Sequence, residues 1–314
     1  MISVVIPVYQ KARHIERALN SALGSLVDAC ADFEIIVVDD GSTDGSGDIA
    51  RSWFKDNHRA IRAQVISQDN RGVSAARNAG WRSAEGDLIL FLDADDEWTV
   101  SHVGEILELA ELYPQASLMT TAWSVIRRDG CQVFHQFGIG ADLKGLLPCF
   151  FRAMSTGPMP VSSSNAAVPM WALRQTGGFP DGVTHGEDTV AWGKLALLGP
   201  VAYSPQIGSV WHQDADNRSD LGKPIAANYM LFLESALKLN SLTDDMKKSI
   251  WINRDIEAAR MAGLMPLYFH DSPGRIDAMT AEEKAMLVEI RDRFADQLVT
   301  SIEAETYASP AMNC

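Results

Sequence analysis

The chain has 314 residues, of which 46% are hydrophobic and 22% are charged, a composition that excludes collagen-like, disordered and disulfide-scaffold proteins. Its 27 basic and 41 acidic side chains give a net charge of −14 at pH 7, which argues against a protein that neutralises nucleic-acid phosphates. The 4 cysteines lack zinc-type spacing, and no apolar run reaches the roughly 20 residues of a membrane-crossing helix. We therefore expect a globular, cytoplasmic protein without nucleic-acid partners.

The first hundred residues alternate short apolar runs with stretches of helical spacing. The chain begins on such a run rather than on a secretory leader. The apolar runs predict strands at 2–8, 33–38, 63–66 and 87–92, and the spaced stretches predict helices at 11–25, 48–54 and 73–84. Strands without polar alternation, separated by helices, indicate a parallel sheet that is covered on both faces. We therefore predict a doubly wound α/β fold, Rossmann-like, with a mostly parallel sheet.

The rest of the chain changes from mixed to helical. Further elements are predicted in the order helix 100–113, strands 117–126 and 131–137, an irregular stretch 138–185 with a helix near 143–153, helix 187–198 and strand 201–211. Beyond about residue 222, helical spacing recurs at 226–240, 243–262 and 281–305. We divide the chain into a catalytic domain, 1–220, and a helical C-terminal extension, 221–314.

Acidic residues follow two of the predicted strands. Asp39 and Asp40 end the second strand, and Asp93 and Asp95 follow the fourth. Ligands bind outside the carboxyl ends of strands in open α/β sheets, so these acids are candidate binding residues. Asp93 and Asp95 point the same way while the chain stays extended, and their hard oxygens suit Mg²⁺ or Mn²⁺. Both acidic turns can also serve only to cap and charge the next helix.

Three further segments carry candidate residues. A glycine turn opens the helix that holds Arg77, whose guanidinium could meet a diphosphate together with the free amides of the helix. Arg71, in the turn itself, could equally be a solvated loop residue. Glu187 and Asp188 begin a helix, where they either cap it or supply a proton acceptor for a hydroxyl nucleophile. His212 follows a strand and is either a metal ligand or an ordinary surface histidine.

The combination of these segments, in this order, resembles the inverting family 2 glycosyltransferases of the GT-A fold. The resemblance covers about residues 1–215. The matching segments are SVVIPVY at 3–9, VVDDGSTDGS at 37–46, DNRGVSAARNAG at 69–80, GDLILFLDADD at 86–96 and GED at 186–188. It implies a nucleotide-binding half, 1–100, and an acceptor-binding half, 101–220.

The resemblance implies a role for each matching residue. The nucleotide site would comprise Pro7, Val8, Tyr9, Asp39, Asp40, Arg77 and Asp93, in which the base is read by Asp40 together with Asp39, the diphosphate lies near Arg77 and the ribose meets Asp93. Asp95 would hold the Mn²⁺ or Mg²⁺ ion, which His212 approaches. Asp188 would be the general base, and Glu187 would face the acceptor.

The implied function is transfer of one sugar from a nucleotide-diphosphate sugar, commonly a UDP-sugar, to a glycan or lipid-linked acceptor in bacterial-type cell-surface polysaccharide synthesis. Gln10 departs from the family's usual asparagine, and the QxxRW element and membrane helices of processive members are missing, which favours a single addition. Two rivals remain, a nucleotidyltransferase and a sugar-nucleotide-binding protein without catalysis. The C-terminal helices pack on the body, bind the acceptor, form a homodimer or contact a membrane-bound partner at the inner face of the membrane.

Overall fold

The computed structural model describes residues 1–57, 62–134, 137, 139–140, 142–156, 159–183, 186–215 and 227–261. The chain forms two compact units, Met1–Leu221 and Gly222–Cys314. The predicted boundary between residues 220 and 221 falls outside the described ranges and stays a prediction. The division of the first 220 residues into a nucleotide-binding and an acceptor-binding half is also untested.

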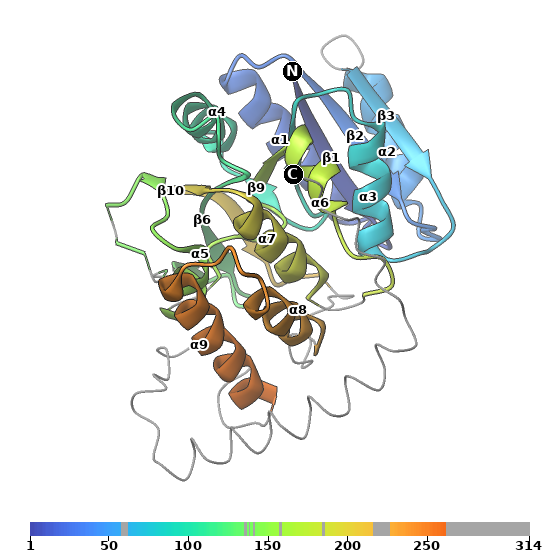
Figure 1. Cartoon of the computed structure of the whole chain (residues 1–314). Helices are drawn as coiled ribbons and strands as arrows, with labels where there is room; N and C mark the ends of the chain where they lie inside the picture. Colours follow the sequence, from blue (N-terminus) through green and yellow to red (C-terminus); the bar gives the residue numbers. More distant parts are fainter. Residues whose placement is uncertain are drawn as a thin grey trace. The chain divides into compact units, whose positions relative to one another are not determined.

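One sheet forms the centre of the first unit (Figure 1). In spatial order its strands are β3 (Arg62–Ser67), β2 (Phe33–Asp39), β1 (Ile2–Val8), β4 (Leu88–Phe91), β9 (Ala166–Pro169), β6 (Leu118–Ile126), β10 (Val201–His212) and β5 (Glu97–Trp98). Two short strands lie off this path, β7 (Gln132–Phe134) beside β6 and β8 (Gly145–Leu146) beside β10. The first four strands in that order are parallel to one another, and β10 is parallel to β6. The predicted α/β class with a mostly parallel sheet is confirmed.

Helices cover both faces of the sheet because β1, one of its inner strands, is apolar on both sides. Alternate residues of β1, from Ile2 to Val8, pack in one core with the helices α1 (Ile15–Asp28), α2 (Ser46–Asn57) and α4 (His102–Leu112). Val5 points to the other face, toward α3 (Val73–Ser83). Gly80 lets α3 approach so closely that a Cβ atom at that position would lie 2.3 Å from Val5 Cγ1. This packing holds the carboxyl end of β1 between two rigid layers.

The predicted irregular stretch 138–185 is the part that the structure corrects. It contains β9, which lies between β4 and β6 and runs antiparallel to both, although β9 has only 4 residues. Its helices are α5 (Phe150–Thr156) and α6 (Met170–Thr176) rather than one near 143–153. A run this short carries no periodicity, so sheet pairing decides its conformation. Helix α7 (Glu187–Leu198) lies where it was predicted.

The first helix also begins later than predicted. It starts at Ile15 instead of Lys11, because the backbone N–H groups of the preceding turn are bonded to side chains of another loop. Lys11 donates to Ser46 Oγ at 2.8 Å and Ala12 to Asp44 Oδ2 at 2.9 Å. These bonds fix residues 11 and 12 in a turn before the helix and satisfy N–H groups that have no helical partner.

The second unit contains two described helices, α8 (Ala227–Leu237) and α9 (Asp244–Met261), which pack on one another. They correspond to the predicted helices 226–240 and 243–262, and the predicted helix 281–305 lies outside the described residues. Within the described part of the chain, every helix is too short or too polar to cross a bilayer. Nothing in the structure tests the predicted homodimer or membrane contact.

Candidate active site

The carboxyl ends of three neighbouring strands meet at one edge of the sheet. The register pairs Val8 at the end of β1 with Asp39 at the end of β2, and Val5 of β1 with Phe91 at the end of β4. The chain therefore delivers Tyr9, Asp40 and Asp93 to the same edge. Strand β1 lies where the order reverses, with β2 on one side and β4 on the other, which is where open α/β sheets bind ligands.

The turn after β1 is tied to the loop that follows β2. Gln10, which replaces the family's usual asparagine, adopts a positive φ of 55°. Its side-chain amide donates to Thr43 Oγ1 at 2.8 Å, and its backbone N–H donates to Ser42 Oγ at 3.1 Å. The departure from the family pattern is therefore accommodated by polar contacts of Gln10 itself. Tyr9, next to it, is 44% exposed at the edge.

Pro7 and Val8 are buried within β1, and their predicted contact with the nucleotide stays untested. Asp39 accepts the N–H of Ser42 at 3.0 Å and organises its own turn. Asp40 is almost fully buried, and its carboxylate accepts N–H groups of Gly72 at 2.8 Å and Arg71 at 2.9 Å. It thus orders the loop before α3, and the predicted reading of the base by either acid remains untested.

Arg77 of α3 joins two acids that are far apart in the chain. Its Nη2 donates to Asp93 Oδ1 at 2.8 Å, and its Nη1 donates to Glu187 Oε1 at 3.0 Å. Burial lowers the pKa of Arg77, but the charges of Asp93, Glu187 and Asp188 outweigh it and raise the pKa. The guanidinium stays charged and positions both carboxylates. The predicted contacts of Arg77 with a diphosphate and of Glu187 with an acceptor stay predictions.

Asp188 follows Glu187 at the start of α7 and belongs to the same charged group. Burial and then the negative charge of Glu187 raise its pKa to about 6, against the opposing effect of Arg77. Its Oδ1 accepts the N–H of Thr189 at 2.6 Å. A carboxylate whose pKa lies near neutrality is suited to take a proton from a hydroxyl group. The bond from the Thr189 N–H to Asp188 agrees with the capping role that the sequence left open. Capping alone does not explain the raised pKa of Asp188.

Three acids follow β4, of which Asp93 pairs with Arg77 and Asp95 with Lys11. Burial, followed by the charges of Asp95 and Asp93, raises the pKa of Asp96 well above its ordinary value, although Ser164 and the His212 N–H bond to it. No three His, Cys, Asp or Glu side chains of the described residues are grouped as a metal site. Mg²⁺ and Mn²⁺ usually take only one or two protein carboxylates and complete their shell with water and phosphate oxygens. The donor set of Asp93 and Asp95 fits such an ion.

His212 lies close to this cluster but faces a different acid. Its Nε2 lies 3.0 Å from Glu97 Oε2, and its backbone N–H lies 3.3 Å from Asp96 Oδ1. Burial and then the charge of Arg17 lower the pKa of His212, which favours the neutral ring. The imidazole is thus available in the form that binds metals, while its predicted role as a ligand stays a prediction.

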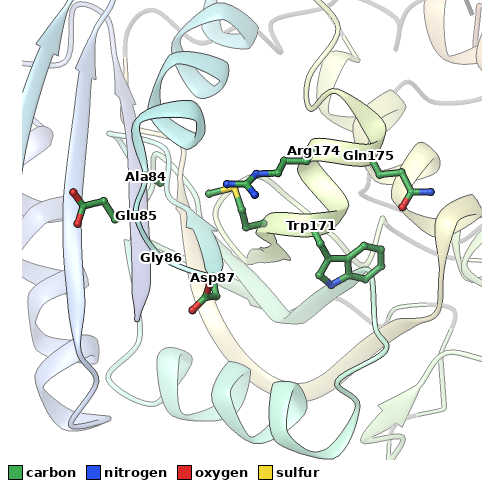
Figure 2. Close-up of a pocket in the computed structure, with 8 residues that line it drawn as sticks. Ala84, Glu85, Gly86, Asp87, Trp171, Arg174 and Gln175 are labelled. Carbon is green, nitrogen blue, oxygen red and sulfur yellow. The ribbon is translucent and has the colours of Figure 1, made fainter. Parts of the chain in front are cut away.

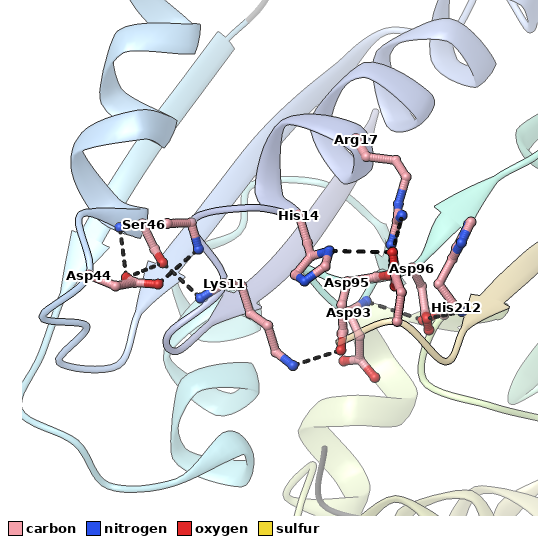
Figure 3. A network of polar contacts seen from close by, with 12 residues as sticks. Lys11, His14, Arg17, Asp44, Ser46, Asp93, Asp95, Asp96 and His212 are labelled. Atoms are coloured by element: carbon pink, nitrogen blue, oxygen red, sulfur yellow. Dashed lines mark hydrogen bonds and ion pairs between the residues drawn. The ribbon is translucent and has the colours of Figure 1, made fainter. Parts of the chain in front are cut away.

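Three basic residues, two in the turn before α1 and one in its first turn, face acidic residues, as Figure 3 shows. Lys11 Nζ lies 2.7 Å from Asp95 Oδ2, and Arg17 donates to the backbone carbonyl of Asp95. Arg17 also pairs with Asp214 at 3.2 Å, and His14 Nδ1 lies 4.0 Å from the same carboxylate. Sequence reasoning missed this group. Its signal was the spacing of three between the basic positions, which places them on one side of a helical turn.

An open cavity of about 560 Å³ lies elsewhere on the first unit (Figure 2). It is lined by Ala84, Glu85, Gly86, Asp87, Met170, Trp171, Arg174 and Gln175. The loop 84–87 precedes β4, whereas Asp93 and Asp95 follow it. The cavity therefore lies at the opposite end of that strand and contains none of the predicted site residues.

Comparison with known proteins agrees with the geometry at the strand ends. The model of the family described as "Glycosyl transferase family 2" matches residues 3–130, which include β1, β2 and β4 with the acids that follow them. Residues 3–130 are thus similar to family 2 glycosyl transferases. The match agrees with the predicted resemblance and, for this segment, with the glycosyltransferase class.

Curated relatives match the same N-terminal part. An uncharacterized glycosyltransferase of Nostoc sp. is 41% identical over 108 residues, which make up 34% of this chain and 32% of the relative. The putative teichuronic acid biosynthesis glycosyltransferase TuaG of Bacillus subtilis is 32% identical over 130 residues, 41% of this chain and 49% of the relative. The chain thus matches at most about half the length of these two relatives.

Solved structures share the fold over most of the chain at low sequence identity. Staphylococcus aureus TarS 1-349 in complex with UDP-GlcNAc has a TM-score of 0.69 at 18% identity, covering 93% of this chain and 80% of TarS 1-349. The mannosyltransferase PcManGT of Pyrobaculum calidifontis, in complex with GDP-Man and Mn²⁺, has a TM-score of 0.58 at 18% identity and covers 92% of this chain and 78% of its own. These likenesses confirm the predicted GT-A fold.

Proposed function

We propose that the chain is a metal-dependent, inverting glycosyltransferase. It moves one sugar from a nucleotide-diphosphate sugar, a UDP-sugar, to a hydroxyl of a glycan or lipid-linked acceptor in cell-surface polysaccharide synthesis. The observation that carries the proposal is the carboxyl of Asp188, whose pKa is raised to about 6 beside the same Arg77 that holds Asp93 at the strand ends. The buried guanidinium of Arg77 thus acts by its charge on the proposed proton acceptor, Asp188, and bonds to Asp93 of the proposed nucleotide site.

Asp188 acts in this mechanism as the general base. Its carboxylate takes the proton of the acceptor hydroxyl while that oxygen bonds to the anomeric carbon, and the bond from this carbon to the diphosphate oxygen breaks. A single displacement of this kind inverts the configuration at the anomeric carbon. Arg77 contributes through its positive charge. That charge opposes the rise in the pKa of Asp188 and keeps the carboxylate ionised near neutral pH.

The strand ends hold the donor. Asp39 and Asp40 read the base next to Tyr9, and Asp93 receives the ribose, with Asp40 also holding the loop that closes the pocket. A divalent cation at Asp95, near His212, would offset the charge of the departing nucleoside diphosphate. The polar turn 42–46 is bonded to the turn after β1 through Gln10 and Lys11, which holds these two loops together beside the strand ends.

The names of the similar proteins support the choice of donor and pathway. TarS is complexed with UDP-GlcNAc, PcManGT with GDP-Man and Mn²⁺, and TuaG is named for teichuronic acid biosynthesis. All three names concern those proteins, and the transfer to this chain is part of the proposal.

Donor screening tests the proposal directly. Thermal shift with a panel of nucleotide sugars, each with and without Mn²⁺, should show one donor that stabilises the protein in proportion to the logarithm of its concentration. Proton NMR of the product formed with that donor should show the inverted anomeric configuration. Retention of configuration would contradict the mechanism, and release of sugar 1-phosphate instead of nucleoside diphosphate would favour a nucleotidyltransferase. Binding without transfer or hydrolysis would favour a non-catalytic sugar-nucleotide-binding protein.

A further inference from the structure

The side chain of Lys11 occupies a position at which the proposed function needs a metal ion. Its ammonium lies 2.7 Å from Asp95 Oδ2, and the two side chains are only 11% and 15% exposed (Figure 3). A lysine on a carboxylate at the surface is usually solvated and contributes little. This pair is largely withdrawn from water, so the ammonium and the carboxylate are each other's main charged partner at this point of the site.

The backbone of Lys11 is held in place by contacts that do not involve its ammonium group. Its N–H donates to Ser46 Oγ at 2.8 Å, and the next residue, Ala12, donates to Asp44. Asp95 is held independently, because Arg17 donates to its backbone carbonyl. Neither anchor uses the Lys11 ammonium. The four-carbon stem can therefore move the charge by several ångströms without disturbing the turn or Asp95.

A divalent ion and the Lys11 ammonium compete for the same carboxylate. An ion that bound Asp95 would stand within a few ångströms of the ammonium, and like charges at that separation repel strongly in a largely buried site. A diphosphate changes this balance, since its oxygens are acceptors that the ammonium can reach while the ion takes the carboxylate. The negative diphosphate then lies between the ammonium and the ion, so the two positive charges no longer compete for Asp95.

We propose that Lys11 is a tethered cation that holds Asp95 when the site is empty and moves to the diphosphate when ion and nucleotide bind together. The divalent ion consequently binds weakly before the nucleotide, and each ligand strengthens the binding of the other. The inference rests on the proposed function for the identity of the ligands. Lys11 thereby favours joint binding of ion and nucleotide over binding of the ion alone.

The test replaces Lys11 with methionine, which keeps the length of the stem and removes the charge. Mn²⁺ affinity is measured without nucleotide by the electron paramagnetic resonance signal of free Mn²⁺, and UDP affinity is measured by calorimetry at saturating Mn²⁺. Lys11→Met should bind Mn²⁺ at least about 10-fold more tightly without UDP, and bind UDP at least about 10-fold more weakly with Mn²⁺, the scale on which one nearby charge shifts an equilibrium. Structural damage alone would weaken both ligands.

Two variants serve as controls. Lys144→Met removes an ammonium that lies 2.8 Å from Glu105 and 2.7 Å from Glu108, carboxylates that are not part of the site, and should change neither affinity. Lys11→Arg keeps the charge and should stay close to the wild type. If Lys11→Met does not fold, Lys11→Gln, which also removes the charge, is put through the same two measurements and should show the same two changes.

The outcomes separate this inference from the proposed function. An unchanged or weaker nucleotide-free Mn²⁺ affinity in Lys11→Met, with wild type that binds Mn²⁺ and UDP together, overturns the role of Lys11 and leaves the transferase proposal standing. Wild type that binds Mn²⁺ equally well with and without UDP also overturns it. Wild type that binds Mn²⁺ in neither condition overturns both the inference and the proposed metal dependence.

Discussion

Replacing Asp188 with asparagine is expected to stabilise the folded protein at pH 7 while it slows sugar transfer. The substitution removes one negative charge from the group of Glu187, Arg77 and Asp93 and keeps the shape of the side chain. The amide oxygen can still accept the Thr189 N–H that Asp188 Oδ1 accepts at 2.6 Å. The change therefore isolates the charge of this carboxylate from its packing and its capping bond.

The magnitude follows from the pKa of Asp188, which is about 6 in the folded protein against an ordinary value of 3.8. A raised pKa means that the folded protein binds this proton more tightly than the unfolded chain does. The stability that Asp188 contributes below pH 3.8 is consequently lost as the pH rises to about 6 and above. A difference of about 2 pKa units corresponds to about 3 kcal/mol, so the ionised carboxylate lowers the free energy of unfolding at pH 7 by at most that amount.

Thermal unfolding at pH 4, 6 and 8 measures this effect. The Tm of Asp188→Asn should exceed that of the wild type by at most about 6–12 °C at pH 8, and the difference should shrink toward pH 4. Glu187→Gln is the matched control, because it removes the negative charge that pairs with buried Arg77 and should lower the stability by about 1–3 kcal/mol. Neighbouring acids of one helix turn thus have effects of opposite sign.

The same variant tests catalysis. Turnover should fall by at least about 100-fold, the usual scale for losing a general base, while the affinity for the donor stays within a few-fold. In the wild type, kcat/KM should rise with pH through about 6 as Asp188 loses its proton and then level off. A variant that is no more stable than wild type at pH 8, or that keeps full turnover, would refute the assignment.

Two further predictions concern the metal and the sheet. Asp95→Ala should abolish the Mn²⁺-dependent part of nucleoside diphosphate binding, and calorimetry that shows equal affinity with and without Mn²⁺ in the wild type would contradict a metal role. Gly80→Ala should cost about 1–3 kcal/mol in urea unfolding, because the new Cβ would lie 2.3 Å from Val5 Cγ1. Gly104→Ala in α4, which meets no atom within 4 Å, should instead add about 0.5–1 kcal/mol, and equal effects of the two would show that the close approach of α3 is relaxed.

Much of the fold could be predicted from residue patterns. The buried runs that became β1, β2 and β4 are nearly continuous and apolar, so their type and order were legible, and with them the edge at which Asp40 and Asp93 lie. The central strand β9 was missed, because 4 residues carry no period and take their conformation from the neighbours that pair with them. The antiparallel placement of β9 between β4 and β6 could therefore be known only from the structure.

The sequence by itself determined which chemical groups this protein presents at its strand ends, since strand ends and turn residues are local properties. Only the tertiary structure decided which charges meet. Arg77 reaches Glu187 across 110 residues of chain, and Lys11 reaches Asp95 across 84. Electrostatic energy depends on distance in space and on burial, and neither is encoded by spacing along the chain. The raised pKa of Asp188 and the ion pair between Lys11 and Asp95 are therefore properties of the folded molecule.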